Sequence, residues 1–225
     1  MKPCDCREPH ERRRIVLTGG PGAGKTAVLE LVQQALCAHV KVLPESAGIL
    51  FSGGFPRGAT DVLRRAAQRA IFHVQCELET ALDVGDAAVL LCDRGTVDGA
   101  AYWPGPGDLW SSVGTTLAEQ LCRYDAVIHL RTPTLDGGFN HRNPLRTETA
   151  VEAAAIDARI ASAWALHPRR FLVEATPDFL AKARRALGII RAEVPACCRG
   201  RLDAAEAEPR GKGVTPGNAS SLDHP

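Results

Sequence analysis

Residues 14–31 read RIVLTGGPGAGKTAVLEL, and this stretch decides the fold. Residues 15–17 form a short apolar run that is typical of a β-strand, and an amphipathic helix pattern begins at Ala27. Between them, GGPGAGKT fits the pattern G-x-x-x-x-G-K-[ST], whose fixed positions are Gly19, Gly24, Lys25 and Thr26. A strand, a glycine-rich loop and a helix in this order predict a phosphate-binding P-loop.

The residue types of this loop suit a phosphate chain. Glycines let backbone N–H groups approach an anion closely, and the first turn of the helix adds the positive end of its dipole. We expect Lys25 to neutralise the outer phosphates and the Thr26 hydroxyl to bind Mg²⁺. A plain glycine-rich turn is the alternative, which the agreement of strand, loop and helix disfavours. The residues expected to contact the nucleotide here are Gly19, Gly20, Pro21, Gly22, Ala23, Gly24, Lys25, Thr26 and Ala27.

The composition indicates one globular domain. The chain has 225 residues, of which 45% are hydrophobic and 24% charged, and this length is enough for a substantial core. A net charge of +1 gives no strong attraction to nucleic acid, so no nucleic-acid partner is predicted. No apolar run reaches the roughly 18 residues that a membrane span needs, and residues 1–14 lack the apolar centre of a signal peptide.

Eight cysteines are scattered along the chain. The pairs Cys4/Cys6 and Cys197/Cys198 lack C-x-x-C spacing, so a zinc site is only weakly supported. We therefore expect reduced thiols and a cytoplasmic protein.

Four more strand patterns follow the P-loop and alternate with helix patterns. The expected strands are residues 40–43, 87–92, 125–130 and 171–173. The expected helices are residues 60–84, 112–122, 149–167 and 177–190, and residues 48–58 and 96–107 are expected to be irregular. This order predicts an α/β fold, a three-layer P-loop NTPase of the nucleoside- or nucleotide-kinase type. Its five-stranded sheet would be largely parallel, with helices on both faces.

Boundaries can also be predicted. The domain is expected to span residues 13–198, between a disordered leader, residues 1–12, and a disordered tail, residues 199–225. The expected helix ends are an N-cap at Thr60, a C′ glycine at Gly85, a capping box from Thr149 to Glu152, and a cap at Thr176 followed by Pro177.

Charged residues follow the strands at the edge where such sheets bind ligands. Asp93 ends an apolar strand and is expected to bind Mg²⁺ or to accept a proton from a substrate hydroxyl; capping of the next turn is the alternative. Arg94 stands where many ATPases carry a second carboxylate. A positive charge there suits binding of an anionic substrate, or the transition state of transfer to an acceptor, better than activation of water.

Other candidates are less sharply defined. Glu45 follows the second strand and is expected either to bind acceptor hydroxyls or to serve as a helix N-terminal carboxylate. Arg142 and Arg146 lie in a polar loop and are expected to be lid residues over the phosphates, with a solvated basic loop as the alternative. Arg57 is a weaker substrate-binding candidate. Thr176 follows the last strand, where an adenine contact is expected.

Several segments together resemble the NadR/Ttd-type AAA domain, a group of P-loop proteins similar to ribosylnicotinamide kinase. They are GGPGAGKT, PESAG followed by FSGGFPR, VLLCDRGTVDGAAYWPG, RYDAVIHLRTP, NPLRTE and HPRRF, which lie within residues 13–198. More distantly, the Asp-Arg turn is similar to that of thymidylate and deoxynucleoside kinases. The resemblance implies binding of ATP or GTP through the P-loop, with Asp93 as the catalytic carboxylate and Arg142 and Arg146 as lid residues.

Two functions remain open at this stage. The first is a Mg²⁺-dependent kinase that transfers the γ-phosphate of ATP to a nucleoside-like or other hydroxylated small molecule. The second is a nucleotide-dependent regulator or phosphoinositide-binding protein without transferase activity; the resembling group includes an insect protein of that kind, and residues 12–14 and 64–65 are basic. A plain ATPase is disfavoured by Arg94, and the oligomeric state is not predicted.

Overall fold

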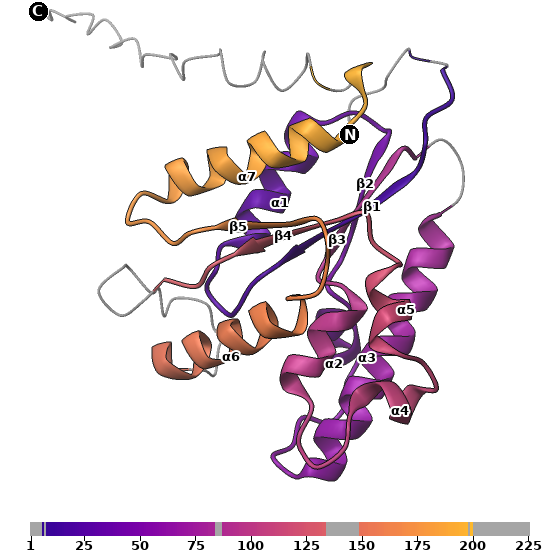
Figure 1. Cartoon of the computed structure of the whole chain (residues 1–225), viewed down its shortest axis with the longest axis vertical. Coiled ribbons are helices and arrows are strands. Elements are labelled where there is room, and N and C mark those ends of the chain that lie inside the picture. The colour runs from indigo at the N-terminus through magenta and orange to yellow at the C-terminus, as the bar shows by residue number, and fades with distance from the viewer. Residues whose placement is uncertain (1–5, 7, 84–86, 134–148, 198, 200–225) are drawn as a thin grey trace, which may run out of the picture.

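One parallel sheet of five strands forms the centre of the molecule, in the order β2-β3-β1-β4-β5. The computed structural model describes residues 6, 8–83, 87–133, 149–197 and 199 (Figure 1). All four strand pairings are parallel, which confirms the predicted sheet. The strands are β1 (Arg13–Thr18), β2 (Val40–Leu43), β3 (Val89–Asp93), β4 (Ala126–Leu130) and β5 (Arg170–Val173).

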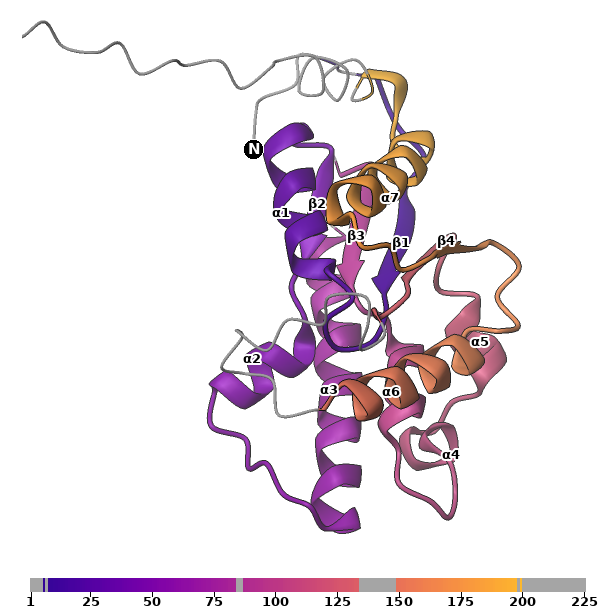
Figure 2. The ribbon, with the colours of Figure 1, turned by 90° about the vertical axis from the view of Figure 1, so that its left-hand side faces the viewer.

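Helices cover both faces of this sheet, as the views in Figures 1 and 2 show. Successive residues of β1 point to opposite faces, and both sides are closed. Ile15 and Leu17 pack in the cluster that includes α1 and α7, whereas Val16 packs with α6 and the C-terminal part of α3. The helices are α1 (Lys25–Ala35), α2 (Ser46–Ser52), α3 (Asp61–Leu82), the 3₁₀ helix η1 (Thr96–Tyr102), α4 (Leu109–Val113), α5 (Leu117–Leu121), α6 (Ala150–Ala163) and α7 (Phe179–Glu193).

Two expected helix starts are confirmed. The Thr60 hydroxyl accepts a hydrogen bond from the Leu63 N–H at the start of α3. Thr149 and Glu152 form the predicted capping box of α6. These caps satisfy N–H groups that the first helical turn leaves without intrahelical partners.

The last helix begins differently from the expectation. Its N-cap is Asp178, whose carboxylate accepts bonds from the N–H groups of Leu180 and Ala181. The predicted cap at Thr176 is therefore wrong: its hydroxyl donates instead to the Asp178 carbonyl, at 2.6 Å. Aspartate is an equally good cap, and sequence alone did not separate the two.

The structure also corrects three predictions, two of irregular segments and one of a single continuous helix. Helix α2 occupies the start of the segment 48–58 and ends at the glycines Gly53 and Gly54. The segment 96–107 contains η1, because Asp98 folds back to accept a bond from the Gly95 N–H at 3.0 Å. The single helix expected at 112–122 is two short helices, since Gly114 takes a left-handed conformation, φ 71°, and ends α4.

Part of the boundary predictions falls outside the described residues. This applies to Gly85, to residues 200–225 of the expected tail, and to residues 1–5 of the expected leader. The described residues of the leader do contact the domain: the His10 ring packs edge-to-face against His39, with 4.8 Å between centroids. Within the described chain, no helix combines the length and apolar character needed to cross a bilayer.

Candidate functional site

The loop between β1 and α1 is wrapped tightly by its own backbone and by neighbouring strands. Gly19, Gly22 and Gly24 have φ values of 141°, 79° and 92°, a region that side chains other than glycine rarely occupy. Gly24 is the N-cap of α1. A Cβ on Gly19 would lie 2.1 Å from the Leu130 carbonyl oxygen at the end of β4. The sequence pattern thus marks glycines that this backbone requires.

Lys25 folds back over the loop. Its Nζ donates to the carbonyl oxygens of Gly19, at 2.9 Å, and Gly20, at 3.4 Å. Burial, and next the positive charge of Arg94, lower the pKa of Lys25 to about 8. Thr26 follows it in α1 with an exposed side chain. The lysine and the threonine therefore stand at the mouth of the loop, where a phosphate chain would need them.

A buried group on α6 that sequence reasoning missed supports the loop from behind. The Asp157 carboxylate accepts bonds from the Gly20 N–H, at 3.0 Å, and from His129 Nε2, at 2.8 Å, and pairs with Arg131 at 2.9 Å. Burial alone would raise the pKa of Asp157, but the bonds from His129 and Gly20 outweigh it and hold this pKa below its usual range. His129 is fully buried. The Gly20 N–H therefore points away from the predicted nucleotide.

Lys182 on α7 is a second missed support. Its Nζ donates to the carbonyl oxygens of Ala23, at 2.8 Å, and Arg131, at 2.5 Å. Burial lowers the pKa of Lys182 to about 8. The sequence around Lys182 does not indicate this role, because its hydrogen-bond partners lie far away in the chain.

Close packing at Gly20 leads to a stability prediction. A Cβ there would lie 2.5 Å from Thr132 Oγ1 and 2.8 Å from Asp157 Cβ. We expect Gly20→Ala to lower the free energy of unfolding by about 1–3 kcal/mol, as other overpacking changes do. The matched control is Gly48→Ala in α2, whose Cβ would meet nothing closer than 3.9 Å and whose helical position favours alanine. Urea unfolding of both variants checks this, and equal stabilities would contradict it.

Asp93 ends β3 with an unsatisfied carboxylate. Its Oδ1 atom is buried and has no hydrogen-bond partner among the described residues. Burial raises the pKa of Asp93 to about 6, and the negative charge of Glu45 adds to this while Lys25 opposes it. A buried carboxylate oxygen without a partner is a suitable ligand for a hard cation such as Mg²⁺. The residues present thus fit the metal that the P-loop implies.

Arg94 is held in a strained position beside Asp93. Among the described residues other than glycine, Arg94 has a positive φ, 71°. Such a backbone conformation costs about 1–3 kcal/mol and is characteristic of functional sites. Arg94 Nε donates to Glu45 Oε1 at 2.5 Å, and its guanidinium carbon lies 5.6 Å from the centroid of the Tyr102 ring. Burial would raise the pKa of Glu45, but Arg94 and Lys25 outweigh it and hold this pKa below the usual value. Glu45 is therefore an ionised partner that aims the arginine.

Asp98 in η1 was not found from the sequence, because it lies in a run rich in glycine and proline. It accepts hydrogen bonds from the Gly95 N–H, at 3.0 Å, and from Trp164 Nε1, at 3.1 Å, and it also bonds the Thr18 hydroxyl. Arg94 Nη1 lies 3.4 Å from it. This buried carboxylate ties the turn after β3 to the end of β1 and to the segment after α6.

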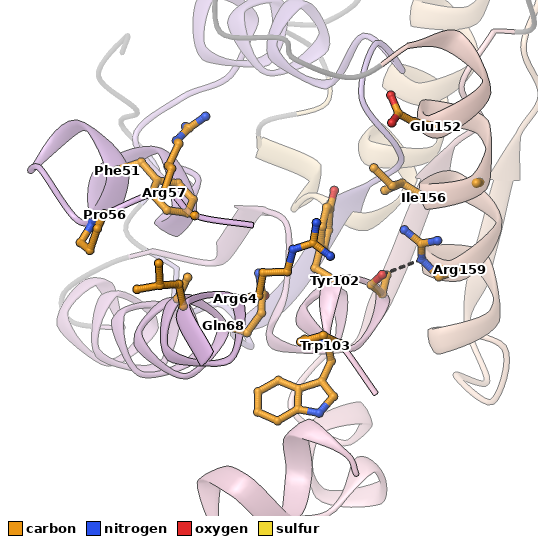
Figure 3. A pocket seen from close by; sticks show the side chains of 16 residues that line it. Phe51, Pro56, Arg57, Arg64, Gln68, Tyr102, Trp103, Glu152, Ile156 and Arg159 are labelled. Atoms are coloured by element: carbon orange, nitrogen blue, oxygen red, sulfur yellow. Dashed lines mark hydrogen bonds between the residues drawn. The ribbon is translucent and has the colours of Figure 1, made fainter. Parts of the chain in front are cut away.

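A cavity of about 630 Å³ opens beside this turn. Figure 3 shows it between residues of α2 and α3 on one side and residues of α6 on the other, with Tyr102 and Trp103 between them. Arg159 Nε donates to the Ala101 carbonyl at 2.7 Å, and Arg57 lies 4.3 Å from the Phe51 ring centroid. The charged residues of the lining are Arg57, Arg64, Arg159 and Glu152. Tyr102 joins this cavity to Arg94.

The predicted site residues therefore fall into three groups. Lys25, Glu45, Asp93 and Arg94 come together at the carboxyl edge of the sheet, close enough to influence one another's pKa values. Thr176 is half-buried before α7, and its expected contact with adenine stays a prediction. Arg142 and Arg146 lie outside the described residues, so the lid also stays a prediction.

Comparison with known structures shows that the fold is similar to that of nucleoside and nucleotide kinases. Thymidylate kinase from Candida albicans has a similar structure, with a TM-score of 0.55 and 15% sequence identity over 81% of this chain and 92% of that chain. Deoxyadenosine kinase from M. mycoides, solved with bound dATP, has a TM-score of 0.56 and 13% identity over 80% of this chain and 99% of that chain. These likenesses show a nucleoside-kinase-like P-loop fold.

A search of curated proteins found no match. The sequence does match a protein-family description, the AAA domain, over residues 14–182. The matched range contains the P-loop, the Asp-Arg turn after β3, and Lys182. By this match over most of its length, the chain belongs to the AAA domain family.

Proposed function

We propose that this protein is a Mg²⁺-dependent kinase that transfers the γ-phosphate of ATP, or of GTP, to a hydroxyl group of a small nucleoside-like molecule. The observation that carries the proposal is the grouping of Lys25, Asp93 and Arg94 next to a cavity large enough for such an acceptor. Tyr102 connects the charged group with the cavity, since it lines the cavity and its ring faces Arg94. We also propose that the protein is a soluble, cytoplasmic enzyme.

The chain's own groups have distinct tasks in the transfer. Backbone N–H groups of the loop and Lys25 bind the phosphates, and Thr26 and Asp93 would hold Mg²⁺, which supplies charge neutralisation when bound. The acceptor oxygen attacks the γ-phosphorus. The bond between the γ-phosphorus and the oxygen that bridges it to the β-phosphate breaks, and the nucleoside diphosphate leaves. If Asp93 holds the ion through a water molecule, its carboxylate is free to take the hydroxyl proton; if it binds the ion directly, the proton passes to solvent. Arg94 stabilises charge on the transferred group, and Glu45 keeps it aimed there.

The cavity also indicates the kind of acceptor. Three arginines and one glutamate line it, so its charge favours an acceptor that already carries an anionic group, such as a nucleoside monophosphate. Tyr102 and Trp103 offer faces on which a base could stack.

The decisive experiment is transfer of labelled γ-phosphate from ATP and GTP, with Mg²⁺, to a panel of nucleosides, ribosides and nucleoside monophosphates. We expect one acceptor class to yield a labelled product far faster than nucleotide is hydrolysed without acceptor. Tight nucleotide binding without transfer to any acceptor would overturn the proposal in favour of a regulator. Binding of the nucleotide-loaded protein to phosphoinositide vesicles would then test that second function.

Arg64 on α3 allows a test of the cavity itself. We expect Arg64→Ala to raise the KM for an anionic acceptor about 10-fold or more, because a hydrogen bond to a charged group contributes about 1.5–3 kcal/mol. The kcat should change less, since this arginine lines the acceptor cavity and is given no part in the transfer itself. The control is Arg184→Ala on α7, also an exposed helical arginine, which should leave both constants unchanged. Equal KM values in the two variants would move the acceptor elsewhere.

A further inference from the structure

A second group of ligand-type side chains lies at the end of the sheet opposite the P-loop. The ligand atoms of Cys6, His10 and Cys197 all lie within 4.8 Å of one another. His10 Nε2 is 3.6 Å from Cys6 Sγ and 3.4 Å from Cys197 Sγ. His39 Nδ1 lies a further 3.5 Å from Cys197 Sγ. Two sulfur atoms and one imidazole nitrogen thus converge from segments that are far apart in the sequence, and His39 adjoins them through Cys197.

These separations are those of ligands around a tetrahedral zinc ion. With Zn–S of about 2.3 Å and Zn–N of about 2.0–2.1 Å, the sulfur-to-nitrogen edge of a tetrahedron is about 3.6 Å. Hydrogen bonding explains the group less well, because one ring nitrogen of His10 faces two sulfur atoms and can make only one strong hydrogen bond at a time. One ion would satisfy both contacts.

These three residues and the neighbouring His39 are positioned by ordered parts of the fold. His39 is buried, and its carbonyl oxygen accepts bonds from the N–H groups of Ala88 and Val89 at 2.8 and 3.0 Å. The His10 ring leans on it edge-to-face. Cys197 follows α7 and packs against the main hydrophobic cluster. Figures 1 and 2 show that α1 and α7 end at this same end of the sheet.

The charge of the group also suits a divalent ion. Two thiolates, one neutral imidazole and a water molecule in the fourth position make a zinc complex with no net charge, which a partly buried site tolerates without further counter-ions. The buried Cys37 adjoins the group, with its Sγ 3.6 Å from His39 Nδ1. His39 Nδ1 therefore contacts the sulfur atoms of both Cys37 and Cys197.

We propose that Cys6, His10 and Cys197 bind Zn²⁺ beside His39, and that the ion joins the segment before β1 to the end of α7. Cysteine spacing supports such a site only weakly, because its ligands come from two separate places in the chain.

Zinc content of the full-length protein tests this site independently of any kinase activity. Protein prepared under reducing conditions with added Zn²⁺ and then dialysed should retain about one zinc ion per chain. Cobalt-loaded protein should show thiolate-to-cobalt charge-transfer absorption. Cys197→Ser and His10→Ala should weaken zinc binding at least about 100-fold, beyond the loss seen when groups that only orient the ligands are changed. Zinc removal by a chelator should lower the Tm of the wild type.

The matched control is Cys122→Ser, which changes an exposed cysteine outside the group and should retain zinc and its chelator response. If Cys197→Ser fails to fold, the charge-transfer absorption of the cobalt-loaded wild type still decides the point. Absence of bound zinc from the wild type would overturn the proposal. So would unchanged zinc binding in Cys197→Ser, or the loss of two titratable thiols through a disulfide between Cys6 and Cys197 with no zinc bound.

Discussion

Replacement of Asp93 by asparagine is expected to lower the rate of phosphate transfer by about 10²–10⁴-fold, the usual contribution of a general base or of a carboxylate aimed at the reacting group. Asparagine keeps the size and shape of the side chain but carries no charge and has little affinity for protons or Mg²⁺. Nucleotide binding through the loop should persist. Asp61→Asn, at the exposed start of α3, is the matched control and should transfer phosphate normally.

The same change should make the nucleotide-free protein more stable. The pKa of Asp93 is about 6 in the folded protein against 3.8 without burial. Between these values the folded state binds more protons than the unfolded state, so the free energy of unfolding falls as pH rises from about 4 to about 6. The difference corresponds to at most about 3 kcal/mol. The neutral amide of Asp93→Asn avoids this cost, so the variant should be more stable than the wild type at pH 7 and equal to it below pH 4.

Two measurements examine these effects separately. Urea unfolding at pH 4 and pH 7, without nucleotide or Mg²⁺, gives the stability difference. The pH profile of kcat/KM should rise at or below about pH 6 in the wild type, because transfer needs the ionised carboxylate and Mg²⁺ lowers the pKa of a carboxylate that it contacts. A variant that is inactive because it is unfolded would be less stable at pH 7. A variant that transfers phosphate with an unaltered profile would show that Asp93 has no part in the chemistry.

The sequence predicts the sheet and the loop well because both depend on neighbouring residues. The loop needs a strand, glycines and a helix in immediate succession, and each buried strand shows as an apolar run. The prediction that residues 96–107 are irregular is wrong for the opposite reason, because their structure depends on distant residues. Their 3₁₀ helix is held by the buried Asp98, whose partners Thr18 and Trp164 are distant in sequence, and no local pattern reports such a contact.

The supports of the site share this property. Asp157 and Lys182 both bond the P-loop, from α6 and α7, across the sheet's carboxyl edge. In the sequence each is one polar residue on a helix. Asp157 stands directly after Ile156 of the buried stripe, so a buried position could have been suspected, but its partners could not. Sequence patterns therefore predict which residues come together at the site better than which residues hold them in place.

Lys25→Met is the second change with a large expected effect. Methionine preserves the length of the side chain and removes the cation, so the loss of a charged hydrogen bond to phosphate should weaken nucleotide binding about 10–100-fold. Transfer should fall further, by about 10²–10³-fold, because the charge that develops on the phosphates in the transition state also loses its partner. Lys41→Met on β2, a strand at the far edge of the sheet, is the control and should bind nucleotide normally.

The pKa of Lys25 gives this prediction a signature beyond a simple loss. In the nucleotide-free protein it is about 8, and the negative phosphates should raise it, so binding takes up a proton above pH 8. Nucleotide affinity of the wild type should therefore fall as pH rises beyond about 8, whereas that of Lys25→Met should stay level. Titration with a fluorescent ATP analogue at several pH values measures both. An affinity that falls equally in the two proteins would assign the proton to another group and remove Lys25 from the phosphate site.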